Sequence, residues 1–205
     1  MSEPPTVSPR RRMSKQQRHT QLLQVARELI RDVGTGEFTL ARLADRAGVT
    51  KPLVYDHFGD RDGVLAELYR EFEARQRQTL RTALGETEPD LPTVAELVAG
   101  AYIDCCLAEG RELADVVAAL TGSATLNRLR REAEAAYLDM CRAALTPLAG
   151  PIDTAGLQAI VGAGDALARS ALDERISAER ARDALARVVT AVATENRHPT
   201  SEETS

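Results

Sequence analysis

The stretch TLARLADRAGVTKPLVYDHF, residues 39–58, constrains this chain more than any other part of the sequence. Two short segments meet there at Gly48, and the apolar residues of each recur at the spacing of an amphipathic helix. Gly48 suits the left-handed end of the first segment. Thr50 is expected to supply the cap oxygen of the second, where Pro52 falls in the first turn and its missing N–H costs little. The pattern predicts a helix-turn-helix.

The second segment carries a face with little reason to be buried. Val49, Val54 and Phe58 can face a small core, which leaves the remaining side chains pointing outward. An ordinary helical hairpin, in which Tyr55 and His57 complete a core or a surface, is the alternative. The outward set is the predicted reading surface: Lys51, Pro52, Leu53, Tyr55, Asp56 and His57.

The exact letters are more specific than the pattern. The run AGVTKPLVYDHFGDRDGVL resembles the second, third and start of the fourth helix of TetR-family transcriptional regulators. It has the family's Gly-Val-Thr turn, the Tyr-x-His-Phe ending and a basic residue, Arg61, three positions later. The motif resemblance covers about residues 13–72. It implies an all-α protein of about nine helices, with a helix-turn-helix DNA-binding domain at 13–60 and an effector-binding and dimerisation domain at 61–195.

Composition agrees with a helical fold. The chain has 205 residues, of which 43% are hydrophobic, so it can bury a sizeable core. Alanine, leucine, arginine and glutamate dominate, and alternating β-branched residues do not occur, which favours an all-helical protein. We expect that no apolar run reaches the length needed to cross a membrane, and the start lacks an apolar signal segment. We therefore expect a cytoplasmic protein.

The formal charge divides unevenly along the chain. Residues 1–61 contain 11 lysines and arginines against 7 aspartates and glutamates, whereas residues 62–205 contain 15 against 24. A basic N-terminal module on an acidic body suits a protein that meets phosphate with one end only. Residues 1–12 are expected to be a disordered basic arm, either lying on DNA or acting as a solubilising tail. Residues 196–205 are expected to be a disordered tail.

Helical periodicity continues through the rest of the chain. Ser14 and Gln17 form a capping-box pair that opens the first helix, and Gly34 and Gly36 end it. A long fourth helix is expected to run from the Asp60 region to about Leu84. Further helices are predicted at about 94–105, 113–120, 125–148, 154–172 and 177–195.

Nothing in the sequence favours catalysis. The histidines lie in three separate regions, and the cysteines, Cys105, Cys106 and Cys141, lack zinc-site spacing. No phosphate-cradling glycine loop occurs. We expect no enzyme activity, no metal site and no cofactor, and cysteines that pack as small hydrophobes rather than sense redox state. A helical adaptor that binds only protein is the alternative to a DNA-binding regulator.

The resemblance implies specific roles in DNA binding. An inverted-repeat operator in double-stranded DNA would be bound by a homodimer, with the helices at about 154–172 and 177–195 forming the dimer contact. Leu53 and Asp56 are the candidates for reading bases, although Asp56 could instead pair with a nearby arginine. The full set of predicted DNA-binding residues is Thr39, Thr50, Lys51, Pro52, Leu53, Tyr55, Asp56, His57 and Arg61.

A small-molecule effector, of unknown identity, is expected to bind in the second domain between the fourth, fifth, sixth and seventh helices. Two tyrosines and the polarizable sulfur groups there would give an adaptable, mostly apolar lining with a few polar handles, suited to a neutral or weakly polar molecule. Asp104 could add a contact to a cation. Plain core packing is the alternative for each position. The predicted lining residues are Tyr102, Cys105, Leu120, Tyr137, Met140 and Cys141.

Overall fold

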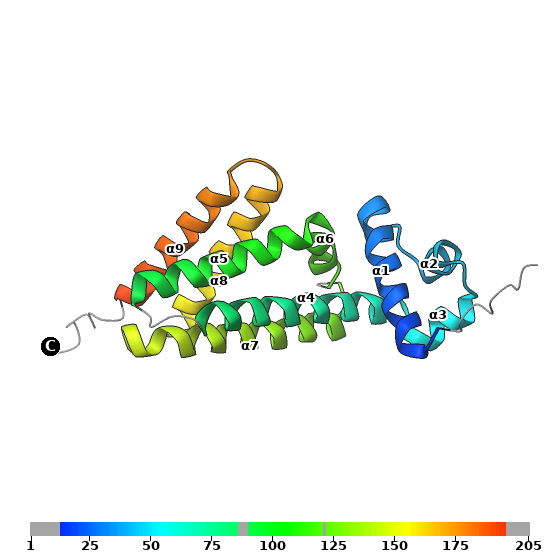
Figure 1. Ribbon diagram of the computed structural model, residues 1–205, viewed down its shortest axis with the longest axis horizontal. Coiled ribbons are helices and arrows are strands. Elements are labelled where there is room, and N and C mark those ends of the chain that lie inside the picture. The colour runs from blue at the N-terminus through cyan, green and yellow to red at the C-terminus, as the bar shows by residue number, and fades with distance from the viewer. Residues whose placement is uncertain (1–12, 86–89, 121, 196–205) are drawn as a thin grey trace, which may run out of the picture. The chain divides into compact units, whose positions relative to one another are not determined.

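The computed structural model describes residues 13–85, 90–120 and 122–195, apart from the side chains of residues 111–114. In these ranges every regular element is an α-helix, and there are nine of them (Figure 1). The predicted all-α fold class is therefore confirmed. The predictions for residues 1–12 and 196–205 lie outside the described residues. The chain forms two compact units, one ending at Val64 and the other beginning at Leu65.

The N-terminal unit contains one long helix, two short ones and the start of a fourth. Its helices are α1 (Lys15–Val33), α2 (Leu40–Ala47) and α3 (Lys51–Phe58). The predicted capping box is present, because the Ser14 hydroxyl accepts from the Gln17 N–H and the Gln17 side chain accepts from the Ser14 N–H. Both phenylalanines of the unit are buried, Phe38 and Phe58, together with Leu22, Ala26, Leu29, Ile30, Leu40, Leu43, Ala44 and Val54.

The remaining six helices follow the predicted order. They are α4 (Arg61–Leu84), α5 (Leu91–Glu109), α6 (Arg111–Leu120), α7 (Ala124–Ala149), α8 (Thr154–Leu172) and α9 (Ala178–Glu195). Helix α5 begins earlier than its periodicity suggested, because the Asp90 carboxylate accepts the Thr93 N–H at 2.9 Å and so caps the helix ahead of Pro92. Gly110 and Gly150 end α5 and α7 with φ values of 72° and 82°.

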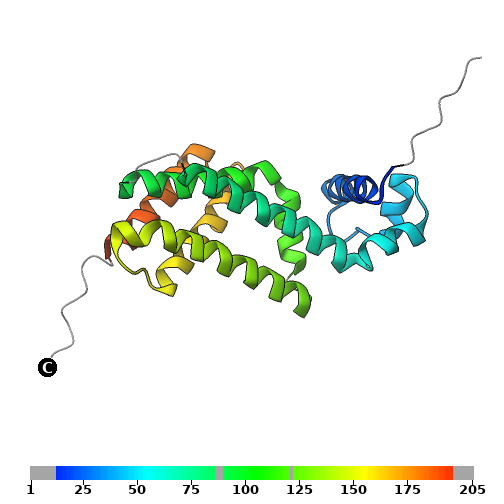
Figure 2. The same ribbon diagram turned by 60° about the horizontal axis from the view of Figure 1, so that its bottom comes forward.

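Helix α5 is the central helix of the C-terminal unit. It packs closely against α8 and α9, which form a hairpin of their own (Figures 1 and 2). With a mean hydropathy of 1.4 over 18 residues, α5 is long and apolar enough to cross a membrane, so the expectation that no run reaches that length is wrong. Half of that window is buried inside the protein, and a core helix passes the same test of length and composition.

The α8–α9 hairpin depends on a close approach at Gly156. A side-chain carbon placed there would lie 2.7 Å from Val192 Cγ1 and 3.1 Å from Oδ1 of Asp153, the residue that caps α8. Gly162, in the same helix, has nothing within 4 Å of such a carbon. Close packing therefore requires glycine at position 156, whereas position 162 has room for a side chain.

We predict that Gly156→Ala destabilises the C-terminal unit by about 1–2 kcal/mol, because overpacking costs outweigh the better helix propensity of alanine. The matched control is Gly100→Ala, in α5, where a new methyl group meets open space. That change should be neutral or stabilising by up to about 1 kcal/mol. Urea unfolding measures both free energies, and similar values for the two variants would contradict the packing argument.

Candidate functional site

The two helices of the helix-turn-helix are capped differently. The Thr39 hydroxyl accepts the Arg42 N–H at 3.2 Å and caps α2, which ends at Gly48 with φ 64°. Thr50 occupies the N-cap position of α3 but makes no side-chain cap hydrogen bond, so the predicted cap oxygen is wrong. Pro52 has no N–H to offer, and the Leu53 N–H already donates to the Thr50 carbonyl oxygen at 3.1 Å.

Helix α3 presents most of its predicted reading surface to solvent. Val54 and Phe58 are buried, Leu53 is half-buried, and Tyr55 is one of the few large apolar side chains that are exposed, at 53%. The positions that α3 leaves exposed are Lys51, Pro52, Tyr55 and Asp56. Asp56 forms an intramolecular pair, as the alternative allowed, but with Lys15 of α1 at 3.3 Å rather than with an arginine. Both partners are exposed, so this pair contributes little to stability.

His57 does not point freely outward. It is half-buried, and its Nδ1 lies 3.3 Å from the Nδ1 of His19 on α1, whose ring also packs 4.9 Å from that of Phe58. Because a hydrogen bond between these nitrogens needs one acceptor, at least one ring must be neutral. Burial lowers the pKa of His57, and so do His19, Lys15 and Arg18, whereas Asp56 opposes them. The predicted outward orientation of His57 is therefore wrong.

Arg61 has an intramolecular role that the sequence did not reveal. Its guanidinium donates to the Thr35 carbonyl oxygen at 2.8 Å and lies 3.9 Å from the Asp62 carboxylate. The side chain thus connects the first turn of α4 to the loop between α1 and α2. A phosphate contact by Arg61 would have to be made alongside this interaction or in exchange for it.

Gly63 controls the turn between α3 and α4. A side-chain carbon at this position would lie 2.0 Å from the carbonyl oxygen of Phe58, a backbone atom, and the Gly63 N–H donates to Asp60 Oδ1 at 2.8 Å. No other residue type fits without moving the backbone. Sequence reasoning missed this role, although the second glycine of GDRDG was the available signal.

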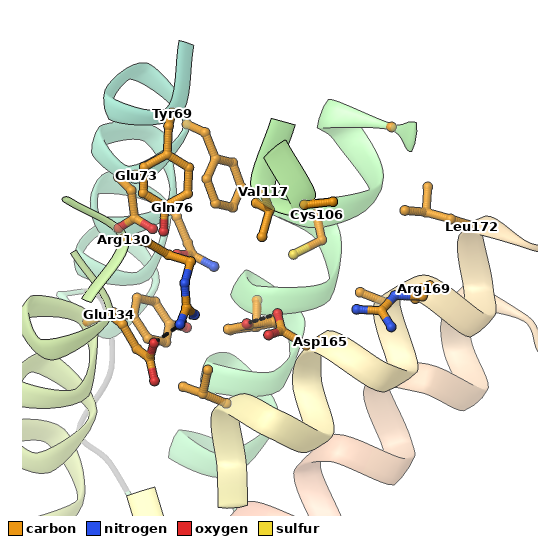
Figure 3. Close-up of a pocket in the computed structure, with 17 residues that line it drawn as sticks. Tyr69, Glu73, Gln76, Cys106, Val117, Arg130, Glu134, Asp165, Arg169 and Leu172 are labelled. Atoms are coloured by element: carbon orange, nitrogen blue, oxygen red, sulfur yellow. Dashed lines mark hydrogen bonds and ion pairs between the residues drawn. The ribbon is translucent and has the colours of Figure 1, made fainter. Parts of the chain in front are cut away.

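A cavity of about 560 Å³ lies inside the C-terminal unit and is drawn in Figure 3. Tyr102 and Tyr137 line it, as predicted, whereas the other four predicted residues, Cys105, Leu120, Met140 and Cys141, do not. Cys106 takes the place expected of Cys105 because neighbouring helical positions point about 100° apart. The wall is formed by Tyr69, Phe72, Glu73, Gln76, Tyr102, Cys106, Gly110, Val117, Ala118, Arg130, Glu134, Tyr137, Val161, Asp165, Ala168, Arg169 and Leu172.

The aromatic residues give the cavity its character. All the aromatic side chains of residues 65–205 line it, namely Tyr69, Phe72, Tyr102 and Tyr137. The scarcity of aromatics in this part of the chain was a signal that sequence analysis did not use. The prediction did not include helix α8 in the cavity wall. Its many small residues were interpreted as a surface for close helix packing, so the contribution of Asp165 to the wall was missed.

Tyr102 is held between α5 and α8. Its hydroxyl donates to Asp165 at 2.6 Å, and its ring meets Tyr137 edge-on with 5.5 Å between centroids. Gly164 makes room for the ring, because a side-chain carbon there would lie 2.7 Å from Tyr102 Cε1. Burial, followed by the Asp165 charge, raises the pKa of Tyr102 far above its ordinary value, so it stays a neutral donor.

The cavity is more charged than a neutral ligand would require. Glu73 is buried and pairs with Arg77 at 3.4 Å. Burial raises the pKa of its carboxyl group, while Tyr69 and Arg77 act in the opposite direction. On α7, Arg130 and Glu134 pair at 3.1 Å. The lining is mostly apolar, as predicted, but its polar groups include charged pairs that the prediction did not name.

Three further groups proposed from the sequence have other surroundings. Asp104 pairs with Arg182 of α9 at 2.6 Å and does not line the cavity. Burial raises the pKa of Cys105 to about 11 and that of Cys141 to about 12, so both thiols are protonated and unreactive at neutral pH. Across the described part of the chain, no cluster of three or more histidine, cysteine, aspartate or glutamate residues could hold a metal ion.

The comparisons with known proteins agree with this geometry. The family model for bacterial regulatory proteins of the tetR family matches residues 22–68. The HTH-type transcriptional regulator BetI 1 of Chromohalobacter salexigens is 43% identical over 54 residues, which are 26% of this chain and 27% of that protein. Both matches assign the N-terminal unit, and no more of the chain, to the TetR type of helix-turn-helix. The matched stretch spans only about a quarter of the BetI relative.

Solved structures extend the likeness to the fold of nearly the whole chain. The fatty acid degradation regulator FadR from Bacillus halodurans superposes with a TM-score of 0.72 at 20% identity, covering 88% of this chain and 97% of that one. The FadR regulator from Bacillus subtilis, solved in complex with stearoyl-CoA, gives 0.69 at 19% identity, with 85% and 98% covered. At these identities the likeness concerns the fold alone.

We predict that Gly63→Ala destabilises the N-terminal unit by about 2–3 kcal/mol or more, because the clash is with backbone and cannot be relieved by a rotamer change. Gly36→Ala, where the new methyl group meets nothing within 4 Å, is the control and should have little effect. Thermal unfolding combined with limited proteolysis of the N-terminal unit measures the change. Equal stability of the two variants would contradict the proposed role of Gly63.

The histidine contact predicts a pH dependence. The pKa of His57 is lower in the folded protein, so the unfolded chain binds more protons near that pKa, and the free energy of unfolding rises with pH. The full stability is present above about pH 6.5, the ordinary pKa of histidine. It is lost as the pH falls through the folded pKa. We expect the free energy of unfolding of the N-terminal unit to fall as the pH is lowered from about 7 to about 5. The variant His57→Gln should show a smaller decrease over the same range. An unchanged pH profile in the variant would contradict it.

Proposed function

We propose that the chain is a DNA-binding transcriptional regulator that binds an inverted-repeat operator as a homodimer and is released by a small-molecule effector. The observation that carries the proposal is the exposed, basic and aromatic face of α3 within a TetR-family helix-turn-helix. An eight-residue helix is about 12 Å long, and the major groove is about 12 Å wide. A cytoplasmic repressor without catalytic activity is the form that the family resemblance favours.

The contacts to DNA can be divided by chemistry. Lys51 and Tyr55 are exposed and suited to phosphate, and the helix N-terminus at Thr39 offers backbone N–H groups to the same partner. Leu53 and Asp56 are the candidates for base readout, through a thymine methyl group and a cytosine amine. Asp56 would have to exchange its pair with Lys15 for a base.

The dimer contact is proposed on α8 and α9. Small residues are exposed at helical spacing along α8, at Ala155, Ala159, Gly162 and Ala166, where a partner helix can approach closely. Two helices from each protomer would form a four-helix bundle. The alternative, a protein-binding adaptor, is less favoured because it gives no reason for the exposed face of α3.

The effector site is proposed to be the cavity of the C-terminal unit. Helix α4 contributes four residues to its wall, from Tyr69 to Gln76, and continues without a break from Arg61. A ligand that displaces α4 would therefore also displace the first turn of that helix, where Arg61 donates to Thr35. The stearoyl-CoA bound by Bacillus subtilis FadR supports the idea that this fold can accommodate a ligand.

We predict that Lys51→Ala weakens binding to a fragment of the chain's own promoter region and flattens the plot of log affinity against log salt. The slope should change by about one unit per half-site, because each neutralised phosphate contributes about −0.9. Arg128→Gln, at an exposed position of α7, is the control and should leave the slope unchanged. Failure of the unaltered protein to prefer the promoter fragment over random DNA would reject the proposed function.

We also predict reciprocal coupling between the two sites. Linkage requires that operator DNA weaken effector binding by the same factor by which effector weakens DNA binding, and this factor is typically about 5–150-fold. Once an effector is known, calorimetric titration with and without operator measures it. Equal effector affinities in the two titrations would show that the cavity is not coupled to DNA.

A further inference from the structure

Two buried side-chain polar atoms lack a hydrogen-bond partner in the described part of the chain, and both belong to the cavity wall. They are Arg130 Nε and the Tyr137 hydroxyl oxygen. Tyr137 is only 2% exposed, and the groups that act on its hydroxyl besides burial are cysteine thiols, first of all Cys141, which are weak hydrogen-bonding groups. Buried polar groups normally find partners, so two such atoms on one cavity call for an explanation.

Two more polar side chains face the same space. Gln76 of α4 is 4% exposed, its amide points into the cavity in Figure 3, and the structure gives it no hydrogen bond. Arg169 reaches in from α8 and has no ion-pair partner among the described residues. Arg169 is exposed to solvent, so the buried side chains with unsatisfied hydrogen-bonding capacity come from α4 and α7, and most of that capacity consists of N–H and O–H donors.

The carboxylates of the cavity, in contrast, already have partners. Glu73 pairs with Arg77 at 3.4 Å, Glu134 pairs with Arg130 at 3.1 Å, and Asp165 accepts from Tyr102 at 2.6 Å. A cationic ligand would therefore compete with existing contacts. An anionic ligand would instead satisfy donors that now have no partner.

We propose that the cavity binds an organic acid, with its carboxylate among Arg130, Tyr137 and Arg169 and its apolar body against the aromatic wall. A volume of about 560 Å³ suits a molecule of drug-like size. Tyr69, Phe72 and Tyr102 offer ring faces and edges to a planar or extended hydrocarbon body. The ligand's role as effector rests on the proposed function, but its binding does not.

The test uses the full-length protein without DNA and compares ligands that share a hydrocarbon skeleton, naphthyl or decyl, and differ only in the head group. The probes are naphthoate, naphthamide and naphthylmethylammonium, and decanoate, decanamide and decylammonium. Isothermal calorimetry should show a carboxylate binding at least about tenfold more tightly than its amide and ammonium counterparts, because charge-assisted hydrogen bonds are about twice as strong as neutral ones. Preference for an ammonium probe, equal affinity for carboxylate and amide, or no binding by either carboxylate would overturn the proposal.

Variants identify the site. Arg130→Gln should reduce carboxylate affinity about tenfold, whereas Arg131→Gln, at an exposed neighbouring position outside the cavity wall, should not change it. Tyr137→Phe should reduce affinity about fivefold without lowering the melting temperature, because its hydroxyl lacks a partner in the unliganded protein. Tyr102→Phe is the matched tyrosine change, and it should lower the melting temperature because it removes the hydrogen bond to Asp165.

The outcomes separate this proposal from the proposed function. A carboxylate that binds equally well to the unaltered protein and to Arg130→Gln and Tyr137→Phe would place the site elsewhere and overturn the inference. Retained preference for promoter DNA in the same preparation would leave the proposed function intact. Loss of the preference for promoter DNA, with normal carboxylate binding, would reject the proposed function and leave this inference intact.

Discussion

The absence of a side chain at Gly63 is the constraint on which the N-terminal unit depends. The Phe58 carbonyl oxygen occupies the space that a side-chain carbon would need, 2.0 Å away, so the chain can leave α3 and enter α4 within two residues. Asp60 then caps the new helix by accepting the Gly63 N–H, and Arg61 reaches the Thr35 carbonyl oxygen. The turn, the cap and the arginine together fix how α3 presents its exposed face within this unit.

The C-terminal unit owes its cavity to a different arrangement. Helices α5, α8 and α9 pack closely, and Gly156 and Gly164 allow that closeness at Val192 and at Tyr102. The Tyr102 hydroxyl donates a hydrogen bond to Asp165, whereas the hydroxyl of the neighbouring Tyr137, on the same cavity wall, has no hydrogen-bond partner. Two tyrosines in edge contact thus have different roles, one structural and one available to a ligand.

Several predictions failed at positions where a neighbour distant in sequence decides the outcome. His57 was expected outside, but His19 lies 38 residues earlier and holds its ring against the first helix. Asp56 was given an arginine partner and has Lys15. Cys105 was preferred to Cys106 for the cavity, because apolar periodicity locates a buried stripe but does not tell which part of it borders a hollow. Glu73 and Gln76 were missed because polar residues in a helix usually mark its solvated face.

The sequence by itself determined the helices, their order and the helix-turn-helix, because caps, glycine ends and 3.6-residue periodicity act between residues close in the chain. It also revealed the likeness of the N-terminal unit to TetR-family regulators, because the residues at 39–58 and around them are specific. Only the tertiary structure decided which side chains line the cavity together, which hydroxyl has a hydrogen-bond partner and where a glycine allows another part of the chain to approach closely. These properties depend on distances between segments far apart in the sequence, and local patterns carry no information about such distances.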